Sequence, residues 1–143
     1  MATTFVAADL AARDWARSNA LISAVAGTRI YLEVPKDYRQ FTKDLKSDIA
    51  ATRTAAQAKF PFISVSRIGG APPSEGTPLD DARISFQCWG ASGAQASQLA
   101  AALVSAVYAR SSAVVLSQLY RPDTDSDLPR YVVDVLFKVR AHN

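Results

Sequence analysis

The feature that most constrains the fold is a strand, a turn and a helix that follow one another within residues 82–110. Ile84, Phe86 and Cys88 alternate with polar residues, and this period of two predicts a strand with one apolar face. Trp89 begins the turn that ends the strand. This strand is therefore expected to place one side against the core.

The helix that follows carries a capping signal and an apolar stripe. Ser92 and Gln95 have the spacing of a capping box, in which the serine hydroxyl accepts from the glutamine amide. Leu99, Leu103 and Val107 recur at intervals of four and predict one apolar face on a helix roughly 24 Å long. Alanines beside them allow close packing on a sheet. We interpret this unit as part of the hydrophobic core, and it shows no evident catalytic or binding motif.

Length and composition indicate one soluble domain spanning residues 1–143. The chain has 143 residues, of which 49% are hydrophobic and 20% charged, with a net charge of +3. So mild a charge does not require a nucleic-acid partner. No signal peptide is recognisable, and no apolar run approaches the ~20 residues of a membrane span, so we expect a cytoplasmic protein without membrane contact. The single Cys88 rules out an internal disulfide and is expected to be a small buried apolar residue.

Patterns elsewhere in the chain predict further helices and strands. Helices are expected at 4–17, capped by Thr3 or Thr4, and at 20–26, ended by Gly27. Strands are expected at 29–34, 62–68, from about 79, at 113–120 and at 131–140, with a loop at 69–78 and a polar turn at 121–129. The expected fold class is α+β: a mainly antiparallel sheet of about four to five strands with helices packed on one face.

Residues 36–59 form an unusual segment between two predicted strands. Tyr38, Phe41, Leu45 and Ile49 have helical spacing, whereas the rest of the segment offers little to bury. Two interpretations stay open. The segment is either a solvated amphipathic helix over one edge of the core, or an arm that reaches a neighbouring molecule.

A search for catalytic and metal-binding patterns favours a protein without an active site. Asp123, Asp125 and Asp127 resemble half of a calcium loop, but Leu128 and Pro129 follow where the loop needs glycine. We interpret the run as an acidic hairpin turn. The lone His142 has no evident partner, and no nucleophile elbow or paired-cysteine motif is present. We expect no catalytic, cofactor-binding or metal-binding residues, and no enzyme.

Charge is distributed unevenly along the chain. The 36–59 segment is basic, whereas two predicted loops are acidic, and opposite-sign patches suit head-to-tail association of subunits. The alternative interpretation is that these charges lie on ordinary solvent-exposed faces of the protein. The candidate interface residues are Lys36, Arg39, Lys43, Lys46, Arg53, Lys59, Glu75, Asp80, Asp81, Asp123, Asp125 and Asp127.

The order of these elements resembles a known family. Quoted along the chain, the matching parts are Trp15 in the first helix, Gly27-Thr28-Arg29-Ile30-Tyr31, Phe60-Pro61-Phe62-Ile63-Ser64-Val65-Ser66-Arg67-Ile68-Gly69-Gly70, Asp81-Ala82-Arg83-Ile84-Ser85-Phe86-Gln87-Cys88-Trp89-Gly90, and Arg130-Tyr131-Val132-Val133-Asp134-Val135. Together they resemble the tail terminator proteins of long-tailed bacteriophages, also called tail-to-head joining or tail completion proteins. The segment at about 36–59 is longer than the corresponding connection in that family, and we interpret it as an inserted arm or helix.

The resemblance implies a small α+β structural subunit that forms a ring, typically hexameric, in the virion. Such a ring caps the tail tube, ends its polymerisation and joins it to the head connector or stopper protein. DNA would pass through the lumen without being read, and assembly would take place in the host cytoplasm. Two alternatives stay open: another connector ring, such as a head-completion or stopper protein, or a DNA-binding module with Lys36, Arg39, Lys43 and Lys46 on phosphates.

Overall fold

Three long antiparallel strands form the centre of the molecule. The computed structural model describes residues 4–5, 8–71, 79–110 and 113–142. Strand β4 (Leu79–Trp89) lies between β3 (Phe62–Ala71) and β6 (Arg130–His142) and pairs with both over most of its length. Apolar residues alternate along all three strands, and β3 pairs with β4 in the antiparallel direction, in agreement with the expected sheet.

Shorter strands complete the sheet at its margins. Strand β5 (Ala113–Tyr120) forms the expected hairpin with β6, whereas β2 (Ile30–Tyr31) runs parallel to β3 at Ile63 and Ser64. Strand β1 (Thr4–Phe5) pairs with the last residues of β6. The order is β1-β6-β4-β3-β2, with β5 also on β6. The expected α+β class with a mainly antiparallel sheet is confirmed.

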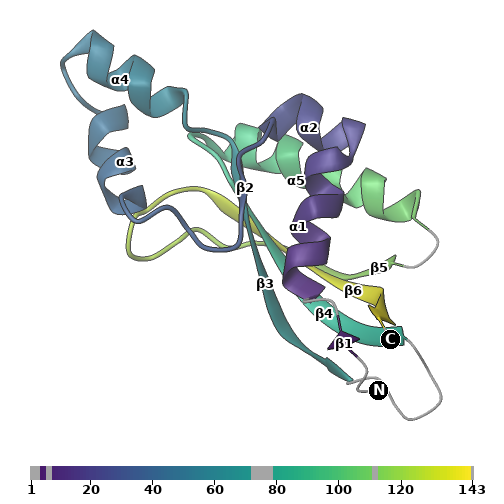
Figure 1. The fold of residues 1–143 in the computed structure, drawn as a ribbon. Helices are drawn as coiled ribbons and strands as arrows, with labels where there is room; N and C mark the ends of the chain where they lie inside the picture. Colours follow the sequence, from purple (N-terminus) through teal and green to yellow (C-terminus); the bar gives the residue numbers. More distant parts are fainter. Residues whose placement is uncertain (1–3, 6–7, 72–78, 111–112, 143) are drawn as a thin grey trace.

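Three helices cover one face of this sheet and enclose the main core (Figure 1). They are α1 (Ala8–Ser18), α2 (Ala20–Ala26) and α5 (Gly93–Tyr108). The buried side chains between helices and sheet include Ile22, Ile63, Val65, Ile84, Phe86, Cys88, Leu99, Leu103, Val133, Val135 and Phe137. Trp15 of α1 packs edge-on against Phe137, with ring centres 5.2 Å apart. The predicted strand-turn-helix unit is therefore the centre of the core.

Side chains cap the starts of two helices, and the cap at Ser92 agrees with the sequence signal. Asn19 caps α2 through its side-chain oxygen, which accepts from the amides of Leu21 and Ile22. Ser92 caps α5 by accepting from the Gln95 amide at 3.2 Å. The Gln95 side-chain oxygen accepts from the amide of Ala91 at 2.7 Å, whereas a regular capping box would pair it with the amide of Ser92.

The beginning of the chain differs from the expected helix at 4–17. Thr4 and Phe5 form β1 opposite Ala141 and His142, and α1 begins only at Ala8. The expected cap at Thr4 is therefore wrong. The physical reason is that the far end of β6 supplies a hydrogen-bonding partner strand for these β-favouring residues, which local sequence cannot reveal.

Other strand boundaries also shift. The strand expected at 29–34 is only two residues long, and β3 continues through Gly69 to Ala71, which the sequence placed in a loop. A bulge between Arg67 and Gly69 lets β3 keep its pairing with β4 through these glycines. The rest of that loop lies outside the described residues.

Cys88 is fully buried in the core, as expected. Burial raises the pKa of its thiol well above the ordinary value, because the apolar surroundings disfavour the thiolate. Among the helices of the described chain, none is long and apolar enough to cross a membrane.

Candidate assembly surfaces

The inserted segment forms a helical hairpin that projects from the body of the molecule (Figure 1). It consists of α3 (Tyr38–Leu45) and α4 (Ala50–Gln57), which we call the arm. The sequence suggested a single helical stretch, but Ser47 interrupts it: its hydroxyl accepts from the Ile49 amide and its carbonyl from Arg53. Only Ala56 of α4 is buried. The second helix therefore contributes very little to the hydrophobic core.

The base of the arm is held by a second apolar cluster beyond the helix-covered core. Phe41 of α3 packs edge-on against Phe60 and Phe62, with ring centres 5.6 and 6.3 Å away. Phe62 stacks on Trp89 at 5.5 Å, and Leu128 closes the cluster. These aromatic contacts anchor α3 on the body of the molecule.

The acidic turn at 121–129 forms the other wall of this cluster. Asp123 points inward, where its carboxylate accepts from the amide and hydroxyl of Ser126 and lies 3.7 Å from Arg130. The Arg130 guanidinium also stacks over Trp89, 5.1 Å from the ring centre. Asp127 adopts a positive φ of 58°, which Asp tolerates better than most residues. The first carboxylate of the run therefore stabilises the turn itself.

The arm and this turn contact each other within one chain. The Thr42 hydroxyl of α3 donates to the Ser126 carbonyl, and Arg39 forms an ion pair with Asp125 at 3.3 Å. Tyr38 first, and Asp125 after it, raise the pKa of the Arg39 guanidinium. In the part of the chain that is described, no three Asp, Glu, His or Cys side chains converge into a metal site.

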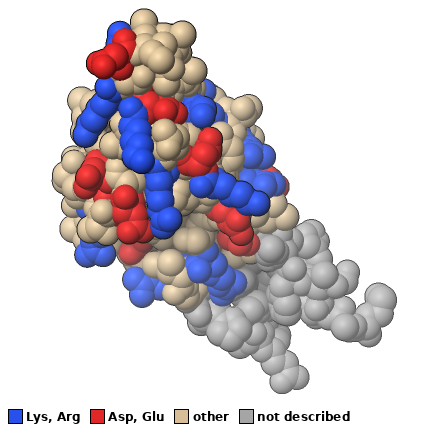
Figure 2. Space-filling model, turned by 90° about the vertical axis from the view of Figure 1, so that its left-hand side faces the viewer, with Lys and Arg blue, Asp and Glu red and all other residues tan. Residues whose placement is uncertain are grey.

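Some of the predicted basic residues form ion pairs or hydrogen bonds within the chain, and others form no ion pair with a described residue. Besides Arg39, Lys59 pairs with Asp37 at 3.5 Å, and Arg53 donates to the Ser47 carbonyl. Lys36, Lys43 and Lys46 are exposed and make no ion pair with any described residue. Figure 2 shows basic and acidic side chains interspersed over this face of the molecule.

The predicted acidic residues lie at opposite ends of the sheet. Asp125 is beside the arm, whereas Asp80 and Asp81 stand at the start of β4, opposite Val139 and Lys138 of β6. Trp89, which contacts the arm, lies at the other end of β4, roughly 27 Å away at 3.4 Å per residue. Glu75 lies outside the described residues. The arm and the Asp80–Asp81 end are therefore too distant to meet within one chain.

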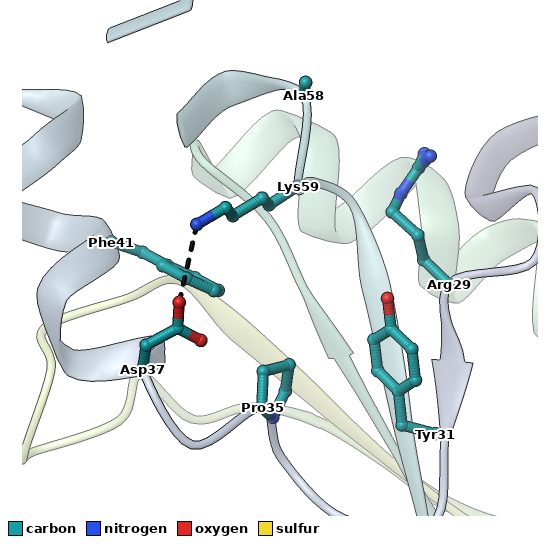
Figure 3. A pocket seen from close by; sticks show the side chains of 7 residues that line it. All are labelled: Arg29, Tyr31, Pro35, Asp37, Phe41, Ala58 and Lys59. Atoms are coloured by element: carbon teal, nitrogen blue, oxygen red, sulfur yellow. Dashed lines mark hydrogen bonds and ion pairs between the residues drawn. The ribbon is translucent and has the colours of Figure 1, made fainter. Parts of the chain in front are cut away.

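An open hollow of about 290 Å³ lies between the arm and β2 (Figure 3). Its lining includes Arg29, Tyr31, Pro35, Asp37 and Lys59. Lys59 turns toward Asp37 and also lies over the Phe41 ring, 4.6 Å from its centre. Arg29 donates from Nε to the Pro61 carbonyl at 2.9 Å. The hollow thus marks the junction of the arm with the body.

Sequence reasoning missed one exposed surface, the edge strand β5. Val114, Leu116, Leu119 and Tyr120 of this strand are all exposed. The signal in the sequence was an eight-residue strand without a single charge.

Comparison with known proteins supports the fold. The chain is similar in structure to a chain of the "Virion of native gene transfer agent (GTA) particle", with a TM-score of 0.55 and 23% sequence identity over 96% of each chain. No protein-family model matches the sequence, and a search of curated proteins gives no match. At this level of identity the likeness establishes a shared fold.

Proposed function

We propose that this protein is a structural component of a phage-like virion and assembles as a ring at the end of the tail tube. The ring, of about six subunits, ends tube polymerisation and joins the tube to the head connector. The observation that carries the proposal is the correspondence of fold with a virion chain over 96% of both chains. The resemblance of the sequence to tail terminator proteins supports the proposed position at the end of the tail tube.

The geometry supports a role carried out by surfaces. The arm projects on an aromatic base and the turn braces it, while most candidate charges stay exposed. A projecting hairpin that buries so little of its own surface fits contact with other subunits. We therefore propose that the protein is not an enzyme and that it binds copies of itself, the tube protein and the connector, with DNA passing through unread.

The test is binding to isolated tail tubes and to portal rings of the same virion. We expect electron micrographs to show ring-shaped density at one end of each tube, and tubes incubated with the protein to stop elongating. Binding to portal rings in place of tubes would identify a head-completion or stopper protein. Duplex DNA binding that falls steeply with salt, without binding to either structure, would contradict the proposal.

A further inference from the structure

The sheet has an open edge on each side within the described chain. Strand β5 pairs with β6 alone, so the backbone of its outer edge has no strand partner there. On the other side, β2 covers β3 only at Ile63 and Ser64, and residues 65–71 continue beyond it. Open edges present unpaired N–H and C=O groups that readily pair with another strand.

The β5 edge is apolar and lacks the features that usually protect an edge strand. It has no charged residue and no proline, although Lys and Pro are common on edge strands, where they discourage pairing with another chain. Val114 is 57% exposed, Leu119 53% and Tyr120 51%. Val114 and Leu119 stand opposite Leu136 and Val132 of β6, on the sheet face away from the helices. A surface of this kind marks an interaction site.

The part of β3 that continues beyond β2, residues 65–71, has a matching character. It contains one charged residue, Arg67, whose Nε donates to the Gly69 carbonyl at 3.2 Å. The bulge residue Ile68 is 52% exposed. Both edges are thus nearly uncharged and carry exposed aliphatic side chains, so each is chemically suited to the other. This match favours a second copy of the chain as the occupant.

We propose that β5 of one subunit pairs with the 65–71 edge of β3 in the next subunit, so that the sheet continues from subunit to subunit. The inference rests on the proposed ring and specifies its contact. Because the two edges lie on opposite sides of one sheet, each added subunit leaves one edge of each kind open. Such head-to-tail pairing repeats until the ring closes.

Charged edge variants test the contact. Leu119→Lys blocks the β5 edge, Ile68→Lys blocks the β3 edge, and Leu21→Lys on α2 is the matched control because Leu21 is 51% exposed. We expect each edge variant to lose ring formation and the control to keep it. Mixing the two edge variants leaves one intact β5 edge and one intact β3 edge, so the mixture should give a dimer and no ring.

Two results would overturn the proposed contact while leaving the proposed function intact: rings from both edge variants, or a symmetric dimer formed by Ile68→Lys alone. If the native protein forms no ring with or without tail tubes, the proposed function fails instead. Hydrogen exchange on the native protein provides a test independent of variant folding. Amides of β5 and of residues 65–71 should exchange more slowly in the ring than in the monomer, and unchanged exchange at both edges would refute the pairing.

Discussion

At the scale of single residues, the joint between β4 and α5 depends on the absence of a side chain at Gly90. A Cβ at this position would lie 2.5 Å from the Ala96 amide nitrogen and 2.7 Å from the Ser92 carbonyl oxygen. Both are backbone atoms of the capped helix start and cannot move independently. The closeness of this turn is what brings the apolar face of α5 onto the sheet.

Replacing Gly90 with alanine should therefore destabilise the protein, with Gly93→Ala as the matched control. We expect Gly90→Ala to lower the free energy of unfolding by about 1–3 kcal/mol through overpacking. A Cβ on Gly93, at the start of α5, meets nothing within 4 Å, so its replacement should stay within about 0.5 kcal/mol. Urea unfolding of both variants measures the difference. Equal stability of the two would show that the joint can relax.

At the scale of elements, the arm combines a fixed base with an exposed tip. Phe41 and its aromatic partners anchor α3, whereas α4 is largely exposed. The charges of the arm follow the same division: Arg39 and Lys59 are paired within the chain, and Lys43 and Lys46 have no ion-pair partner among the described residues. The second pair is the one available to a neighbouring molecule.

Removing two positive charges at a time distinguishes these roles. One double variant combines Lys43→Gln with Lys46→Gln, and the other combines Arg39→Gln with Lys59→Gln. Both lower the net charge by the same amount. We expect the first to raise the protein concentration needed for assembly, more strongly at low salt, because screening is then weak. The second should have a smaller effect, since exposed ion pairs within a chain contribute little. Sedimentation at two salt concentrations provides the comparison, and equal effects would exclude a specific role for the unpaired lysines.

The sequence was informative for elements whose partners are local. The capping signal at Ser92 marked the start of α5, and the alternation in β4 identified its core face. Prediction failed where a distant segment decides the structure. Thr4 and Phe5 form a strand because the end of β6 lies beside them, and the arm has an anchored base because Phe60 and Leu128 meet under it.

The candidate surfaces were predicted less completely than the fold. Sequence charge singled out Arg39, Lys43 and Lys46 as candidate interface residues, and all three are exposed, but it could not show that Asp125 would pair with Arg39 in the same chain. The inward turn of Asp123 was likewise hidden, because it depends on Arg130 and Trp89 meeting across the turn. The open edge of β5 could be recognised only from the order of the strands in the sheet.

At the scale of the whole molecule, the proposed subunit offers four surfaces to other molecules. The arm stands at one end of the sheet, the Asp80–Asp81 segment at the other, and the open strands at its two sides. Surfaces that differ from one another favour head-to-tail contacts, which form a ring when the rotation from subunit to subunit closes. The same arrangement leaves the helix-covered core untouched by assembly.

The most direct test of ring assembly is native mass measured against protein concentration, with electron micrographs of the same samples, alone and after addition of tail tubes. The proposed ring assembly predicts closed rings of one size, about six subunits, that form as concentration rises or on the tube end. A protein that stays monomeric at every concentration and forms no rings on tail tubes would contradict it.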